Sequence, residues 1–146
     1  MKYSLLIISF FLISGCAPTS ERYNLGDGYV AYGFDVVSYF EGKPVKGLDD
    51  FIVEYDGVSL KFATEAHAQT FERNPGQFLP QYGGFCAYAI AEGERVDIDP
   101  ETYQILDGKL YLFYNAWGTN TLELWSREGP EILRDRADRN WSEMIK

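Results

Sequence analysis

The chain is 146 residues long and has a formal net charge of −9, with 22 Asp and Glu residues against 13 Lys and Arg residues. A surface this acidic argues against nucleic acid and anionic lipid headgroups as partners, because both would be repelled. The length and an aromatic content of 16% suit one domain with its own hydrophobic core.

The N-terminal segment has the pattern of an export signal. Lys2 is the only charged residue before Glu21, and residues 5–13 are almost wholly apolar. A membrane span needs about 20 apolar residues, so this run is too short to cross a bilayer, but it fits the core of a signal peptide. We therefore predict that residues 1–15 are a signal peptide.

The residues that follow, Ile13-Ser14-Gly15-Cys16, resemble the lipobox of bacterial lipoproteins. The resemblance implies cleavage before Cys16 and attachment of palmitate-type acyl chains to that cysteine. Several acyl chains together anchor a protein stably, at about 0.8 kcal/mol for each buried CH₂ group. The alternative is an ordinary signal peptide followed by an incidental cysteine. We predict an exported lipoprotein on a bacterial membrane, facing the periplasm or the exterior, with residues 16–28 as anchor and tether.

The sequence pattern of residues 29–80 predicts short strands and helices around one hairpin. Residues 29–32 are expected to be extended, and Asp35 to cap a short helix through Phe40. Residues 51–55 and 58–62 flank Asp56-Gly57, a favoured two-residue hairpin turn. Thr64 is expected to cap a helix that ends near Arg73, before Asn74-Pro75, and residues 77–80 to form one more turn.

The C-terminal part predicts a second hairpin and two helices. Residues 85–91 fit either a helix or a strand. Residues 103–106 and 109–114 flank Asp107-Gly108, and Gly129-Pro130 divides residues 120–146 into two helices. In the later helix, Leu133, Ala137 and Trp141 form a single apolar stripe that is expected to pack in the core. We predict one α+β domain of small antiparallel hairpins packed with short helices.

His67, the single histidine, is the first candidate for chemistry. On the helix that begins after Thr64 it shares a face with Phe71, so it is expected to point inward. Two interpretations follow. Either His67 is a histidine at the edge of the core with a satisfied hydrogen bond, or it is a metal ligand or general base.

Cys86 is the second candidate, because acylation of Cys16 leaves it without a partner in the chain. It follows Gly83-Gly84, where a positive φ would let the backbone bend tightly or approach another segment closely. Cys86 is then either a small buried hydrophobic residue or a thiolate that acts as a ligand or nucleophile.

If Cys86 and His67 meet, two kinds of chemistry are open to them. A thiolate and an imidazole suit copper or another soft metal ion, with Asp35, Asp97 or Asp99 available as oxygen ligands. The same two groups are also the minimum for a catalytic Cys–His pair, with Cys86 as nucleophile and His67 as base. No CxxC, HExxH, P-loop or GxSxG pattern is present in the sequence.

Several stretches resemble the YHS domain family. They are GFDVVSYF (residues 33–40), GVSLKFATEAH (residues 57–67) and FERNPGQFLP (residues 71–80). YGGFCAY (residues 82–88), Asp99-Pro100, DGKLYL (residues 107–112) and Tyr114-Asn115 resemble an exported subset with a longer C-terminal half. The resemblance identifies residues 29–146 as a YHS-like domain with a C-terminal helical extension.

The resemblance implies metal binding, because YHS domains occur in metal-handling proteins and are thought to bind metal through cysteines. At the positions of those cysteines this chain has Ser38, Ala63 and His67. A metal site here would have to be rebuilt from His67 and Cys86, with Asp35 as a further ligand. We expect a membrane-anchored module that binds a soft metal or a small ligand. The alternatives are a Cys–His thiol enzyme and a non-catalytic interaction scaffold whose protein partner the sequence does not identify.

Overall fold

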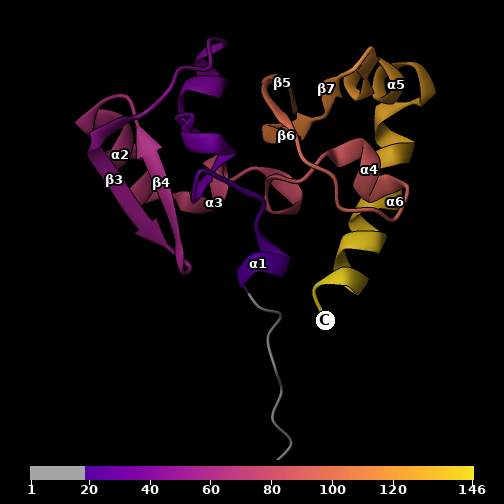
Figure 1. Ribbon diagram of the computed structural model, residues 1–146, viewed down its shortest axis with the longest axis horizontal. Helices are drawn as coiled ribbons and strands as arrows, with labels where there is room; N and C mark the ends of the chain where they lie inside the picture. Colours follow the sequence, from indigo (N-terminus) through magenta and orange to yellow (C-terminus); the bar gives the residue numbers. More distant parts are fainter. Residues whose placement is uncertain (1–18) are drawn as a thin grey trace, which may run out of the picture.

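The computed structural model describes residues 19–146, and the first half of this region is built on one small sheet (Figure 1). Its strands lie in the order β1-β2-β4-β3, with β2 parallel to β4 and the other pairs antiparallel. They are β1 (Leu25–Gly26), β2 (Tyr29–Val30), β3 (Leu48–Tyr55) and β4 (Val58–Phe62). The predicted signal peptide and the lipid attachment at Cys16 lie outside the described residues.

Both predicted hairpins are confirmed. The turn at Asp56-Gly57 joins β3 to β4 with Tyr55 opposite Val58. The turn at Asp107-Gly108 joins β5 (Asp99–Leu106) to β6 (Lys109–Phe113). All four turn residues have positive φ, between 50° and 79°, which is the backbone of the two-residue turn that suits twisted strands.

Two further tight turns were not predicted. Asp27-Gly28 joins β1 to β2, and Trp117-Gly118 joins β7 (Asn115–Ala116) to β8 (Thr119–Asn120), again with positive φ at both turn residues. The first of these corrects the expected tether, which was taken to extend to Gly28. The short helix α1 (Thr19–Arg22) and strand β1 precede that point, and Asn24 is already buried at 6% exposure. The folded domain therefore begins earlier than residue 29.

The helices agree with the sequence pattern where capping residues mark them. Helix α2 (Glu65–Arg73) begins after Thr64, whose hydroxyl accepts from the backbone N–H of His67. Pro75 opens α3 (Pro75–Phe78), and the ambiguous stretch after Gly84 forms the helix α4 (Ala87–Ala91). Gly129, with a φ of 104°, separates α5 (Thr121–Glu128) from α6 (Pro130–Met144). The helix expected to end at Phe40 is a short 3-10 helix, Ser38–Glu41.

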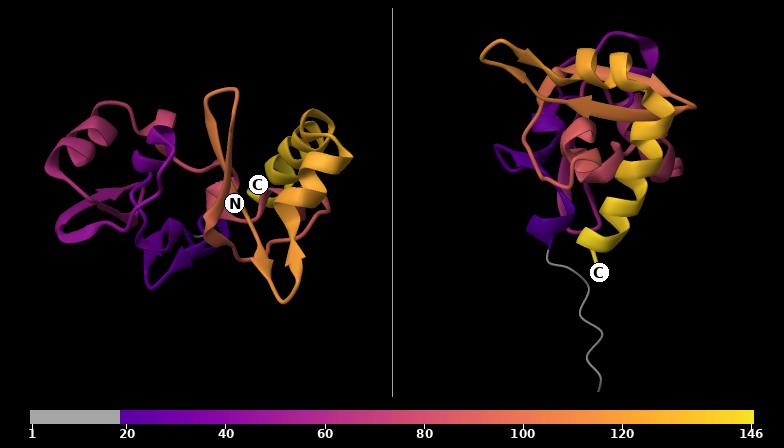
Figure 2. Two further views of the ribbon diagram at one scale, coloured as in Figure 1. Left: turned by 90° about the horizontal axis from the view of Figure 1, so that it is seen from above. Right: turned by 90° about the vertical axis from the view of Figure 1, so that its right-hand side faces the viewer.

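Two hydrophobic clusters form the core. One lies between the sheet and α2, where Phe71 packs against the rings of Phe62 and Tyr55. The other lies under α6, where Leu133 and Ala137 are buried with Trp125, as the apolar stripe predicts. Figures 1 and 2 show the first cluster's elements on one side of the molecule and α5 and α6 on the other, with the β5–β6 hairpin between them.

Helix α1 and the C-terminal end of α6 lie at the same end of the molecule, as Figure 1 and the right-hand view of Figure 2 both show. Residues from both segments line one surface pocket, which includes Arg22 and Ile145. The chain therefore enters the folded domain beside this pocket. Over residues 19–146, no helix combines the length and the apolar character that a membrane span requires.

Candidate functional site

Asp35 and His67, two of the three predicted metal ligands, are in direct contact. The Nδ1 atom of His67 lies 2.6 Å from Oδ2 of Asp35, and its Nε2 atom lies 3.2 Å from a carboxylate oxygen of Glu41. The carboxylate of Asp35 is fully buried, whereas that of Glu41 is 60% exposed. Both ring nitrogens thus face carboxylates, an arrangement that favours the protonated imidazolium with two N–H donors.

The backbone explains why a carboxylate is buried at position 35. The N–H groups of Val37 and Ser38 donate to Oδ1, and the N–H of Ala63 donates to Oδ2 at 2.8 Å. With the His67 ring added, Asp35 ties the loop before the 3-10 helix to the start of α2. A carboxylate with this many donors is stabilised in its charged form without contact with water. The pair is therefore a structural clamp between two segments.

We expect the clamp to weaken as pH rises. Partial burial lowers the pKa of His67, but the hydrogen bond and charge of Asp35, with those of Glu41, outweigh burial and raise it above 6.5. A raised folded-state pKa gives stability that is complete below the unfolded pKa and is lost as pH rises through the folded one. As the pH is raised from about 6 to about 9, the urea concentration at the unfolding midpoint of the wild type should decrease. His67→Gln should remove that decrease. Equal pH dependence in both proteins would contradict the assignment.

Cys86 lies in a different environment from His67. It is fully buried, and its sulfur is 3.3 Å from the hydroxyl oxygen of Thr121. The hydroxyl of Thr121 donates to the backbone carbonyl of Tyr114 at 2.8 Å. Its single proton is therefore used, and in the contact with Cys86 the thiol is the donor and the hydroxyl oxygen the acceptor. Cys86 is therefore a fully buried thiol in contact with the hydroxyl of Thr121.

The structure does not bring Cys86 and His67 together. Their hydrogen-bond partners differ, and Figure 1 shows α2, which carries His67, at the opposite side from α4, which follows Cys86. Among residues 19–146, no group of three or more His, Cys, Asp or Glu side chains is placed to hold a metal ion. Asp99 is engaged by Thr102 and by the backbone of Glu101. The described geometry offers a soft metal no Cys–His ligand pair.

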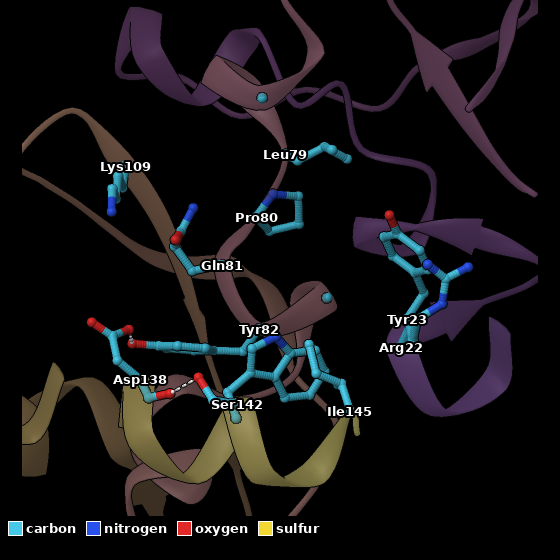
Figure 3. A pocket seen from close by; sticks show the side chains of 13 residues that line it. Arg22, Tyr23, Leu79, Pro80, Gln81, Tyr82, Lys109, Asp138, Ser142 and Ile145 are labelled. Carbon is cyan, nitrogen blue, oxygen red and sulfur yellow. Dashed lines mark hydrogen bonds between the residues drawn. The ribbon is translucent and has the colours of Figure 1, made fainter. Parts of the chain in front are cut away.

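A surface pocket of about 520 Å³ lies where three segments meet, and this size is typical of small-molecule sites. Figure 3 shows Arg22 and Tyr23 on one wall, Lys109 and Asp138 on the other side, and Ser142 and Ile145 below. The remaining lining residues come from the chain around α3, from the turn before Cys86 and from α6: Gly76, Leu79, Pro80, Gln81, Tyr82, Gly83 and Trp141.

Tyr82 and Asp138 form the polar centre of this pocket. The hydroxyl of Tyr82 donates to Asp138 at 2.8 Å, and burial, reinforced by this hydrogen bond, raises the pKa of Tyr82 well above its usual range. Ser142 donates to the backbone carbonyl of Asp138 at 2.8 Å. The ring of Trp141 packs edge-on against Tyr82, with centroids 6.2 Å apart. The pocket thus presents aromatic surface beside fixed hydrogen-bonding groups.

Arg22 and Tyr23 form the opposite wall of the pocket. Arg22 pairs with Asp56 at 3.0 Å, and the hydroxyl of Tyr23 donates to the same carboxylate at 2.9 Å. Burial and this hydrogen bond raise the pKa of Tyr23 to about 12, so both side chains are held in place as a neutral phenol and a paired guanidinium. On the side of Asp138, the Lys109 side chain has no hydrogen-bond or ion-pair partner among the described residues, so it can turn to a ligand.

Gly83 explains how the N-terminal segment becomes part of the pocket. It has a φ of +62°, and a Cβ atom there would lie 1.8 Å from the carbonyl oxygen of Arg22. The carbonyl of Gly83 accepts from the N–H of Asn24 at 2.9 Å, and the Asn24 amide donates to Gly84 at 3.2 Å. Both glycines have the positive φ that the sequence predicts, and Gly83 makes the predicted close approach to another segment.

Sequence reasoning did not identify this pocket. Trp141 was expected only to pack in the core, and Tyr82 was noted only as a neighbour of Cys86. The only local indication was the pair Gly83-Gly84, which predicted a close approach of two backbone segments but did not identify the second segment. No family model matches the chain, and no curated protein or solved structure is significantly similar to it, so the resemblance to the YHS domain stays a prediction.

Proposed function

We propose that this protein is a lipid-anchored module that binds a small ligand outside the cytoplasm. The observation that carries the proposal is the pocket between α1, the Tyr82 turn and α6. Concave sites of this size, with aromatic walls and a few convergent polar groups, are the usual form of small-molecule sites in proteins.

The position of the pocket is consistent with the predicted anchor. Cys16 precedes the first described residue, Thr19, by three residues, and three residues span at most about 10 Å. Arg22, at the end of α1, and the next residue, Tyr23, line the pocket. Acyl chains on Cys16 would therefore keep the pocket near the membrane surface.

The lining groups indicate the chemistry of the ligand. Tyr82, Trp141 and Tyr23 offer flat aromatic surface, whereas Asp138, Gln81 and Lys109 offer acceptors and donors around it. Such a mixture suits a small molecule with one apolar face and several hydrogen-bonding groups at its edge. Because Asp56 neutralises Arg22, and Asp138 and Lys109 carry opposite charges, the site does not select strongly for either sign of charge.

Neither the soft-metal site expected from the sequence nor the thiol-enzyme alternative gains support from the geometry. A Cys–His thiol enzyme needs a nucleophile within reach of its base and of substrate, and Cys86 is buried beside Thr121. A copper site on Cys86 and His67 would require the two residues to leave separate hydrogen-bonded environments. We therefore assign binding to the pocket rather than to Cys86.

Filling the pocket tests the proposal. Gly76 lines it, and a Cβ atom at that position would have open space around it, so Gly76→Trp should intrude without disturbing the fold. Ile132→Trp is the matched control, because Ile132 is 71% exposed and lies outside the pocket lining. Saturation-transfer NMR on the full-length protein in detergent micelles would use N-acetylglucosamine, benzoate and benzamidine as neutral, anionic and cationic probes.

We expect at least one probe to bind to the wild type and to Ile132→Trp, and its signal to be lost in Gly76→Trp. Binding that persists in Gly76→Trp would place the ligand elsewhere. The absence of binding by all three probes at millimolar concentration would also contradict the proposal.

Replacement of Cys16 tests the anchor separately. Cys16→Ser removes the only thiol that the lipobox-like segment offers for acylation, so the protein should move from the membrane fraction to the soluble fraction of the cell envelope. Intact mass should drop by the mass of the acyl groups. Cys86→Ser, which replaces the other cysteine, is the control and should stay with the membrane. An unchanged distribution of Cys16→Ser would show that the N-terminus anchors in another way.

A further inference from the structure

The edge of the sheet opposite β1 is a second feature that points to a partner. β3 is the last strand in the order β1-β2-β4-β3, so its outer edge carries backbone N–H and C=O groups that no strand of the described region pairs. Such an edge is a template for the addition of another strand. Three of the exposed large hydrophobic residues also lie on this strand: Leu48 (50%), Ile52 (43%) and Tyr55 (36%).

A groove runs along this edge between β3 and helix α2. It has a volume of about 450 Å³. Register places Val53 opposite the buried Leu60, so Val53 and Phe51 point to the same face of the sheet as the core, and Ala68 of α2 faces them across the groove. The groove is therefore the place where the apolar layer between the sheet and α2 reaches the protein surface. A strand added to β3 would place every second side chain over this apolar floor.

The rim of the groove is acidic. Asp50 lies on the strand side, and Glu65 and Glu72 lie on the helix side. Among the described residues, neither Asp50 nor Glu72 has a hydrogen-bonding or ionic partner. Asp49 and Glu54 lie on the same strand but outside the groove lining, and both have partners: Asp49 forms an ion pair with Lys61, and Glu54 accepts from the hydroxyl of Ser59. An incoming strand with lysine or arginine side chains would be attracted to this rim, and an acidic one would be repelled.

The same charges disfavour a second copy of this chain as the occupant. Parallel, in-register pairing of β3 with another β3 would bring Asp50 close to its own copy, and antiparallel pairing about the middle of the strand would place Asp49 opposite Glu54. Like charges across strands destabilise a pair. The irregular register between Leu48 and Ile52 also limits extended self-pairing, because a bulge twists and shortens an edge. The charges thus select a basic strand from another protein over self-association.

We propose that β3 and α2 form a docking groove for an extended, basic segment of a partner protein. The partner strand pairs with the free edge of β3, so every second side chain turns toward α2. On that face a central apolar side chain covers Phe51, Val53 and Ala68, and lysine or arginine side chains on either side of it meet the carboxylates of Asp50, Glu65 and Glu72. This surface is separate from the small-molecule pocket, whose lining residues it does not share.

A charge exchange tests the groove. The probe is a fluorescently labelled eight-residue peptide in which lysine residues lie on both sides of a valine-rich centre, and its counterpart has glutamate in place of lysine. The groove variant is Asp50→Lys combined with Glu72→Lys, one change on each side of the groove at exposed positions. The matched control is Glu94→Lys combined with Glu131→Lys, which alters the net charge equally at exposed positions outside the groove.

Fluorescence anisotropy with the full-length protein in detergent micelles should show that the lysine peptide binds the wild type and the control variant. We expect at least a tenfold loss of affinity in the groove variant, and a gain of binding to the glutamate peptide by that variant alone. Equal affinity of the groove variant and the control would mean that only net charge matters, and it would overturn the proposal. The proposal would also fail if the wild type bound neither peptide, or dimerised through β3 instead.

Discussion

Replacement of Asp35 by alanine is expected to destabilise the domain by about 3–5 kcal/mol, the range for breaking a buried, hydrogen-bonded charge pair. The carboxylate is fully buried and accepts from three backbone N–H groups as well as facing the His67 ring. Alanine would leave all of these donors without an acceptor in a region closed to water.

Urea unfolding measures this loss, and Asp49→Ala is the matched control. Asp49 also forms an ion pair, with Lys61 at 2.5 Å, but its side chain is 85% exposed, so we expect its replacement to cost less than about 1 kcal/mol. A double-mutant cycle with His67→Gln would measure the coupling free energy between the Asp35 carboxylate and the His67 imidazole. If Asp35→Ala cost no more than Asp49→Ala, Asp35 would not be the clamp between the loop and α2.

Gly83→Ala is the second replacement with a large expected effect. Its φ of +62° is costly for alanine, by about 1–2 kcal/mol. The added Cβ atom would also meet the Arg22 carbonyl oxygen at 1.8 Å, which forces the N-terminal segment to move. Overpacking of this kind costs about 1–3 kcal/mol in addition.

Gly108→Ala separates the two contributions to this effect. Gly108 has a similar φ of +71°, but no atom lies within 4 Å of the position that its Cβ would occupy. In a urea titration we expect Gly108→Ala to reduce the free energy of unfolding only by the conformational cost of its positive φ, and Gly83→Ala to reduce it clearly more. Gly83→Ala should also expose residues near Arg22 to proteolysis. Equal losses in the two variants would show that the close approach to Arg22 does not matter.

The elements that could be predicted are those whose signals lie within a few residues of one another. Asp56-Gly57 and Asp107-Gly108 supply the positive φ that a two-residue turn needs, and both hairpins formed there. Thr64 marked the start of α2, and Gly129-Pro130 marked the boundary between α5 and α6. In each case the backbone preferences of the turn or capping residues restrict the structure of the few residues around them.

The missed elements had weak or incomplete local signals. Trp117-Gly118 forms a tight turn although tryptophan is not a usual turn residue, and the flanking strands have only two residues each. The β1–β2 hairpin depends on the parallel pairing of Tyr29 with Ser59, which is distant in the chain. Such short strands form because tertiary contacts hold them, which their own composition does not reveal.

Local sequence patterns are sufficient to predict the α+β class, the two main hairpins and the capped helices, and they single out Asp35, His67 and the glycines before Cys86. Which of these residues meet is a property of the folded chain: His67 lies against Asp35, Cys86 lies against Thr121, and Gly83 lies against Arg22. Caps and turns can be predicted because they depend on backbone preferences within a few residues. Pairings across the chain depend on how the two hydrophobic clusters pack, and no single segment encodes that packing.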